Sequence, residues 1–275
     1  MSEQVAPSES VWLIGASSGI GKALIDELDH PSMRLFISAR NQNELERLSE
    51  KRLGQVTPVA LDMTDDASVA EAAEVIRGHS QSLNRVIVNA GTCEYMDSWT
   101  VDLKLVERVM QTNFFGVLKI VNAALPFLRQ ARSDGSDVSQ LVLMSSSVSY
   151  QALPRAHAYG ASKSALRYFA ECLKIDLQHE GIDVRVVSPG FVKTPLTDRN
   201  DFPMPFLIEA DEAARRIVSG MHSGRFDIAF PRRFTWILRT FANLPQRLKF
   251  SMLAKTSRHP DVVSDHKRNG AENHG

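Results

Sequence analysis

The stretch Val11-Trp-Leu-Ile-Gly15-Ala-Ser-Ser-Gly19-Ile-Gly21 decides the fold. Its first four residues are apolar and predict a buried strand, the glycines predict a turn, and a helix is expected from there to about Asp29. Gly15 permits the tight turn, Gly19 lets the backbone approach a pyrophosphate, and Gly21 allows close packing of helix on strand. The start of the helix adds N–H donors and a partial positive charge. Strand, turn and helix in this order predict a phosphate-binding site rather than a flexible glycine loop.

The chain beyond this turn alternates short apolar runs with longer helical patterns. Strands are expected at 35–38, 56–61, 85–88, 140–144, 184–187 and 227–230. Helices are expected at 43–53, 69–77, 103–131, 158–179 and 210–222, with Pro126 as a kink or break. Mostly apolar strands that alternate with helices predict an α/β fold, a parallel, Rossmann-type doubly wound sheet in three layers with helices on both faces.

Composition and length predict one domain over residues 1–254, with a disordered polar tail over 255–275. The 275 residues include 32 Lys or Arg and 32 Asp or Glu, so no global charge favours nucleic acid. The first ten residues, MSEQVAPSES, lack the features of a signal peptide, and no run approaches the roughly 20 apolar residues of a spanning helix. Cys93 and Cys172 are far apart and show no metal-site spacing, and Cys172 is expected to pack in a helix. A cytoplasmic location is therefore expected.

Two segments near the C-terminal end differ from the alternating pattern. Residues 195–208 hold three prolines and several apolar side chains, and they predict a loop or broken helix. Residues 225–258 carry eight Lys or Arg against one acid, and Pro245 divides the basic amphipathic part, 231–254, into two short helices. Such a helical extension could lie on an anionic membrane surface, form a subunit interface or cover the substrate cleft.

The sequence Tyr159-Gly-Ala-Ser-Lys163 places a phenol and an ammonium group one helical turn apart. A nearby ammonium favours the phenolate and lowers the pKa of a tyrosine, which is ordinarily near 10. Ser146 lies thirteen positions upstream and could hold a carbonyl oxygen against the phenol. The three side chains together predict a proton-transfer site for alcohol or ketone chemistry, although a tyrosine four residues before a lysine is by itself a common pattern.

These motifs, in this order, resemble the short-chain dehydrogenase/reductase family, in its compact single-domain branch. The resemblance covers about residues 10–195 and rests on the glycine spacing, Asn89-Ala90-Gly91, Asn113, Ser146, Tyr159, Lys163, and Pro189-Gly190 with Thr194. Ile14 departs from the family pattern, which often has threonine there. The resemblance also implies that residues 195–208 are the substrate lid, in which Phe202, Met204, Phe206 and Leu207 could wall an apolar pocket or merely pack the lid onto the body.

The resemblance implies a role for each catalytic residue. Tyr159 would donate a proton to the carbonyl oxygen during reduction and accept it during oxidation. Lys163 would lower the pKa of Tyr159 and bind the nicotinamide ribose, and Ser146 would polarise the carbonyl. Asn113 would hold a water that links Lys163 to solvent, unless it is merely a solvated or capping residue of a long helix. His157 is expected to be a loop histidine rather than a substrate contact.

The end of the second strand, Ser38-Ala39-Arg40-Asn41, lacks the acid that an NAD site usually places there. Arg40 suits a 2′-phosphate, so NADP(H) is expected over NAD(H), unless Arg40 is a solvated surface residue. Asp62 resembles the acid that contacts adenine, or it caps the next helix. The expected cofactor-binding residues are Gly15, Ser17, Ser18, Gly19, Ile20, Gly21, Arg40, Asp62, Met63, Asn89, Ala90, Gly91, Tyr159, Lys163, Pro189, Gly190, Val192 and Thr194.

The function predicted from these residues is an NADP(H)-dependent oxidoreductase that acts on a carbonyl or secondary alcohol, with an apolar or lipid-like substrate as one interpretation. Two other classes stay open: a catalytically silent NADP-binding regulator, and a membrane-docked interaction protein that uses residues 231–254. A homodimer or homotetramer is expected from the resemblance. No metal is expected.

Overall fold

Seven parallel strands form one sheet in the order β3-β2-β1-β4-β5-β6-β7 in the computed structural model, which describes residues 8–97 and 101–255. Each neighbouring pair is parallel, so the predicted doubly wound sheet is confirmed. The strands are β1 Glu9–Ile14, β2 Met33–Ala39, β3 Gln55–Ala60, β4 Arg85–Val88, β5 Gln140–Met144, β6 Asp183–Pro189 and β7 Asp227–Phe230.

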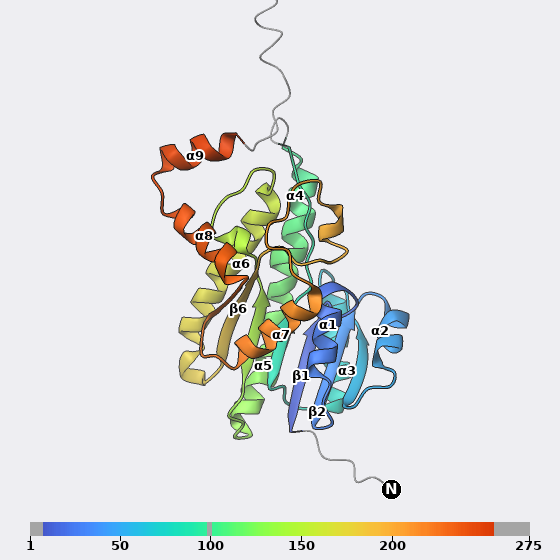
Figure 1. Ribbon diagram of the computed structural model, residues 1–275. Coiled ribbons are helices and arrows are strands. Elements are labelled where there is room, and N and C mark those ends of the chain that lie inside the picture. Colours follow the sequence, from blue (N-terminus) through green and yellow to red (C-terminus); the bar gives the residue numbers. More distant parts are fainter. Residues whose placement is uncertain (1–7, 98–100, 256–275) are drawn as a thin grey trace, which may run out of the picture.

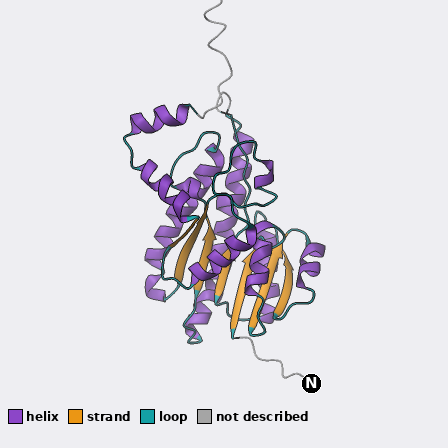
Figure 2. Cartoon of the chain, in the orientation of Figure 1, coloured by secondary structure: helices purple, strands orange, loops and turns teal. Residues whose placement is uncertain are grey.

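Helices cover both faces of this sheet and make the three predicted layers (Figures 1 and 2). The helices that follow or connect the strands are α1 Gly19–Leu28, α2 Gln42–Ser49, α3 Asp66–His79, α4 Leu103–Met110, α5 Val117–Ser133, α6 His157–Asp176 and α7 Ala210–Met221. Two more, α8 Arg232–Ala242 and α9 Gln246–Ala254, form the expected C-terminal extension. No helix in the described part of the chain is long and apolar enough to span a membrane.

Side chains that alternate along each strand divide the core between the two faces. Trp12 and Ile14 of β1 pack with α3, α5 and α6, whereas Val11 and Leu13 pack with α1, α2 and α7. Trp12 is fully buried and donates from Nε1 to the Ser38 hydroxyl at 2.9 Å, so its one polar atom is satisfied. Burial on both faces explains why the strands read as nearly continuous apolar runs.

The strand order reverses between β1 and β4, because the chain leaves β1 toward β2 and returns on its other side. In open α/β sheets, ligands bind outside the carboxyl ends of the strands at such a switch point. The glycine turn follows β1 and Asn89-Ala90-Gly91 follows β4, so the fold brings both motifs to this edge.

The expected helix over 103–131 differs from the structure in two ways. A π-helical segment, η1 Gln111–Gly116, separates α4 from α5. Pro126 was expected to kink or break the helix, and the break is absent, because α5 continues through it to Ser133. Pro126 is exposed, while Phe127 and Leu128 beside it are buried, so packing of the inner face outweighs the lost backbone hydrogen bond.

Other expectations fail locally. Cys172 is exposed on α6 and does not pack in the core. His157 is the first residue of α6 rather than part of a loop. The predicted division of the basic segment is present, since α8 and α9 meet at Pro245, but α9 buries none of its described side chains. Its contact with a membrane or a subunit stays a prediction. The expected disordered tail lies outside the described residues except for Lys255.

Candidate active site

A cleft of about 740 Å³ lies at the carboxyl ends of the central strands. Its wall includes Ser146, Tyr159 and Lys163 together with all the residues expected to bind the cofactor except Gly21. Asn113 does not line the cleft either, because its side chain is fully buried. The fold therefore brings the phosphate turn and the proposed proton-transfer residues to one cavity, although they are up to 148 positions apart in the sequence.

The glycine turn is shaped by close backbone contacts. Gly15 has a φ of +83°, and a Cβ there would lie 2.5 Å from the Ala90 nitrogen. Gly19 has a φ of +53° and faces Thr194, whose Cγ2 would be 2.9 Å from a Cβ. Asn89 donates from Nδ2 to the Gly15 carbonyl at 2.9 Å and holds the turn against β4. Side chains at the two glycines would fill the space between the turn and the opposite wall.

Gly21 does not line the cleft, but it has a structural role in this turn. A Cβ at Gly21 would lie 1.9 Å from the Gly15 carbonyl oxygen, so only glycine allows α1 to start this close to the end of β1. This contact agrees with the close helix–strand packing expected for the third glycine. The N-cap of α1 is Ser18, and no side chain caps the helix, so its first N–H groups face the cleft.

Arg40 and Asp62 line the far end of the cleft, beyond β2 and β3. Arg40 is exposed, and no ion pair to it occurs within residues 8–97 and 101–255. Asp62 accepts from the Thr64 hydroxyl at 2.7 Å and from the Thr64 N–H at 2.9 Å, and these bonds lower the pKa of its carboxyl. The alternative that Asp62 caps the next helix is wrong, because Asp65 accepts from Ala67 and caps α3.

Tyr159 and Lys163 lie one turn apart on α6, and Ser146 follows β5. The Ser146 hydroxyl lies beside the Tyr159 phenol and acts to lower its pKa. The Lys163 Nζ lies 5.9 Å from the centroid of the Tyr159 ring. Helix and strand end thus place a phenol, a hydroxyl and an ammonium group on the same wall of the cleft.

The pKa values of this pair differ from the prediction made for them. Burial raises the pKa of the Tyr159 phenol well above its ordinary value, the Cys93 thiol acts in the same direction, and the nearby Ser146 hydroxyl opposes both. Burial lowers the pKa of Lys163 from 10.5 to about 8. The expected lowering of the tyrosine pKa by Lys163 is therefore absent in the protein by itself, because burial of the phenol has the largest effect on its pKa.

Asn113 lies in the π-helical segment and holds the loop after β4. Its Oδ1 accepts from the Thr92 N–H at 2.8 Å, and its Nδ2 donates to the Thr92 carbonyl at 2.8 Å and to the Ser162 hydroxyl at 3.1 Å. A Cβ at Gly91 would lie 3.1 Å from this Oδ1 and 3.3 Å from the Lys163 Nζ. The alternative of a solvated or capping asparagine is wrong, since Asn113 is fully buried.

Sequence reasoning missed a group of side chains between β4 and α4. Cys93 and Tyr95 influence the pKa values of each other, and Cys93 also raises the pKa of Tyr159. Glu94 pairs with Arg108 at 2.8 Å, and both line the cleft. These residues directly follow Asn89-Ala90-Gly91, so their position along the chain was the one available signal.

The segment 195–208 reaches across to this group. The Phe202 ring lies edge-on to Tyr95, with 5.3 Å between ring centroids, and 6.0 Å from the ring of Phe191. Arg155 donates to Asp97 and to Asp201 at 3.0 Å each and so joins the two sides. Of the four expected wall residues, Phe202 and Met204 are partly buried, whereas Phe206 and Leu207 are exposed.

Known proteins match this chain over most of its length. A family model described as short chain dehydrogenase matches residues 9–202. An uncharacterized oxidoreductase from Myxococcus xanthus is 31% identical over 237 residues, which are 85% of this chain and 92% of that protein. The 11-beta-hydroxysteroid dehydrogenase 1A of Arabidopsis thaliana is 32% identical over 70% of this chain, and the match spans 54% of the plant protein.

Solved structures show the same fold. A short chain dehydrogenase from Burkholderia cenocepacia in complex with NADP superposes with a TM-score of 0.76 at 24% identity. The superposition covers 90% of this chain and 98% of the bacterial one. The shared fold places the carboxyl ends of the strands in equivalent positions.

Proposed function

Because the chain belongs to the short-chain dehydrogenase family, it is an oxidoreductase acting on CH–OH or C=O groups, and from this premise we propose that it is an NADP(H)-dependent reductase of an apolar carbonyl compound. One observation supports the proposal above all others. Tyr159, Ser146 and Lys163 lie on the wall of the same cleft as the glycine turn and Arg40. A dinucleotide held along this cleft would meet a proton donor at one end and a guanidinium at the other.

The residues of the cleft fit a dinucleotide. The turn at Gly15 and Gly19 has no side chain where a pyrophosphate would pass, and the N–H groups that begin α1 offer donors to it. Gly91 leaves space in front of Asn113 and Lys163, where a ribose would be held. Val192 and Thr194 would contact the nicotinamide side of the cleft. When bound, the cofactor supplies the hydride.

Proton transfer would fall to Tyr159. Its raised pKa keeps the phenol protonated at neutral pH, as a donor to a carbonyl oxygen must be. Ser146 lies beside this phenol and would share the same oxygen, so that developing negative charge would meet two donors. Lys163 would bind the ribose hydroxyls and, when charged, favour release of the phenol proton to the carbonyl oxygen. Asn113 supports this arrangement by fixing Thr92 and the backbone before it.

Arg40 supports NADP(H) over NAD(H). It follows β2, where an acid would accept from the ribose 2′-OH of NAD, and it lines the cleft. It forms no ion pair among the described residues, and its charge helps to lower the pKa of Asp62 across the same end of the cleft. A guanidinium in that place binds a 2′-phosphate through charge-assisted hydrogen bonds.

An apolar substrate is supported by the aromatic residues near Tyr159. Tyr95, Phe202 and Phe191 form a continuous series of ring contacts that leads from the loop after β4 to the segment 195–208. Phe191 continues the series to Phe234 of α8, at 5.5 Å between ring centroids. A bulky apolar molecule that extended from Tyr159 toward these rings would pack against them.

The test is an NADPH-oxidation screen across bulky and small ketones, aldehydes, 3-oxoacyl compounds and oxosteroids. Wild type should turn over at least one bulky apolar carbonyl, and Tyr159→Phe should lose roughly a thousandfold or more of that activity while binding NADPH normally. Tyr168→Phe is the matched control, because Tyr168 lies on the same helix and is 73% exposed. Full activity in Tyr159→Phe would refute the assignment. NADPH binding without turnover of any substrate would favour the silent regulator.

A further inference from the structure

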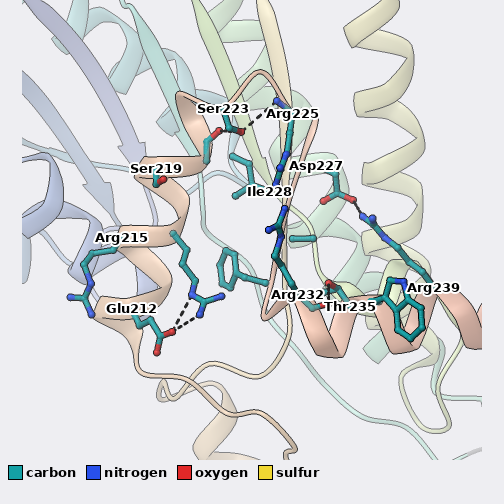
Figure 3. A pocket seen from close by; sticks show the side chains of 15 residues that line it. Glu212, Arg215, Ser219, Ser223, Arg225, Asp227, Ile228, Arg232, Thr235 and Arg239 are labelled. Carbon is teal, nitrogen blue, oxygen red and sulfur yellow. Dashed lines mark hydrogen bonds and ion pairs between the residues drawn. The ribbon is translucent and has the colours of Figure 1, made fainter.

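A second cavity, of about 690 Å³, lies between α7, β7 and α8 (Figure 3). It shares no lining residue with the cleft that contains Tyr159. Its wall carries five arginines and two acids, which are Arg215, Arg216, Arg225, Arg232, Arg239, Glu212 and Asp227. The cavity is therefore strongly positive, although the chain as a whole has a net charge of zero.

Both acids of this cavity are already paired. Glu212 accepts from Arg216 on the next turn of α7, at 2.6 and 3.1 Å. Asp227 accepts at Oδ2 from Arg239 and from Arg167, each at 2.6 Å. The Glu212 carboxylate and the Asp227 Oδ2 are thus engaged, and neither forms an ion pair with Arg225 or Arg232, although the Asp227 Oδ1 is buried without a hydrogen-bond partner among the described residues.

Arg225 and Arg232 lie at the two ends of β7, which is an edge strand of the sheet. Figure 3 shows their side chains pointing toward one another along the strand. Neither makes an ion pair with any residue of the described ranges. Two guanidinium groups that converge repel each other, whereas an anion between them would be held by both.

The beginning of α8 adds to the positive field. Arg232 is the first residue of this eleven-residue helix, whose first turn contains no acid and whose N–H groups have no side-chain cap. Trp236, one turn later, lines the cavity and is 68% exposed. Helix N–H groups and converging guanidinium groups together suit a tetrahedral, doubly charged anion better than a planar carboxylate.

We propose that this cavity binds a phosphate group, with Arg225 and Arg232 as its main ligands. The phosphate would come from a free phosphorylated compound or from a lipid headgroup. The proposal does not rest on the oxidoreductase function, because the two cavities are separate. The arginines have two alternative roles, and each leads to a different experimental outcome. They could protect the β7 edge against strand pairing, or they could contact a second subunit.

Calorimetric titration of the full chain with pyrophosphate tests the proposal, with NADPH at saturation so that the dinucleotide cleft is filled. Wild type should bind one pyrophosphate per chain, and Arg225→Gln/Arg232→Gln should weaken binding at least tenfold, as loss of charge-assisted hydrogen bonds implies. Arg233→Gln is the matched control, because Arg233 is the next residue of α8, exposed, and outside the cavity wall. Arg225→Lys/Arg232→Lys keeps the charge and should retain part of the affinity.

Vesicles distinguish the two sources of phosphate. Binding to phosphatidylcholine vesicles with 5% phosphatidylinositol phosphate, lost in the double glutamine variant, would assign a lipid headgroup. Binding of pyrophosphate without binding to these vesicles would assign a free compound. Equal pyrophosphate affinity in wild type and the double variant, or an equal loss in Arg233→Gln, would overturn the proposal. A change of oligomeric mass in the double variant by light scattering would also overturn it in favour of an interface.

Discussion

The Lys163 Nζ donates a hydrogen bond of 2.7 Å to the carbonyl oxygen of Met144, the last residue of β5. The lysine is 3% exposed, and this bond joins α6 to the end of the sheet beside Ser146. The charged form is stabilised by the carbonyl but loses its water, and the second effect is larger, since the pKa of Lys163 falls to about 8. A buried lysine in this state makes the stability of the protein depend on pH.

We expect Lys163→Met to remove a rise in stability between pH 8 and 10. In the unfolded chain Lys163 keeps its proton up to pH 10.5, whereas in the folded protein it loses the proton above about 8. The unfolded state therefore binds more protons in this window, so the free energy of unfolding increases with pH, by about 2 kcal/mol between pH 8 and 10. Tyr159 opposes this only above pH 10, because its pKa is raised.

Urea unfolding at several pH values measures this dependence in wild type and Lys163→Met. The difference in the free energy of unfolding between the two proteins should change with pH from 8 to 10 and be nearly constant from pH 5 to 7. A constant difference across the whole range would contradict the lowered pKa.

Arg40→Ala should weaken NADPH binding much more than NADH binding. Loss of a guanidinium that binds a 2′-phosphate costs roughly 1.5–3 kcal/mol, or about tenfold to a hundredfold in Kd, and NADH has no such group. Fluorescence titration with each cofactor measures the two Kd values. Arg47→Ala is the control, because Arg47 pairs with Glu44 on α2 and lies outside the cleft wall. An equal effect on both cofactors would remove the argument for NADP(H).

Asn113→Ala should lower both stability and turnover. The substitution leaves the part-buried N–H and carbonyl of Thr92 without their partner, which costs roughly 1–2 kcal/mol in the free energy of unfolding. Turnover should fall because the loop that carries Gly91 toward Lys163 loses its support. Asn122→Ala, at an exposed position of α5, should change neither quantity. Unfolding curves and kcat with the best carbonyl of the screen test both effects, and wild-type values in Asn113→Ala would contradict them.

The strands and the glycine turn were predictable because their signals are local. Residues 85–88 and 140–144 are short apolar runs, buried on both faces, and the structure places β4 and β5 at the same bounds. The turn at 15–21 requires glycine for contacts within one strand–helix unit and with β4. Local residue types therefore determine these elements, and sequence patterns report them well.

The environment of Tyr159 was not predictable in the same way. Cys93, Tyr95 and Phe202 reach it from loops whose conformation depends on contacts such as Arg155 with Asp97 and Asp201. No periodicity marks such residues. The predicted lowering of the Tyr159 pKa was wrong for a related reason. Burial of Tyr159 and Lys163 depends on the whole cleft, and its effect on their pKa values is larger than the effect of their four-residue spacing.

Phe202→Ala should raise KM for a bulky apolar ketone without a comparable fall in kcat. The ring of Phe202 lies 5.3 Å from that of Tyr95, and we expect it to contact a bulky substrate without taking part in proton transfer. Loss of one aromatic contact is worth roughly 1 kcal/mol, which corresponds to about fivefold in KM.

Initial rates with a bulky and a small ketone separate the two parameters for Phe202→Ala. The small ketone does not reach the ring, so its KM should stay within about twofold of wild type, by the same conversion of energy to affinity. Leu207→Ala is the control, because Leu207 belongs to the same segment but is 42% exposed. Equal increases in KM for both ketones would mean that Phe202 supports the segment as a whole rather than the apolar substrate. An unchanged KM for the bulky ketone would place its binding surface elsewhere in the cleft.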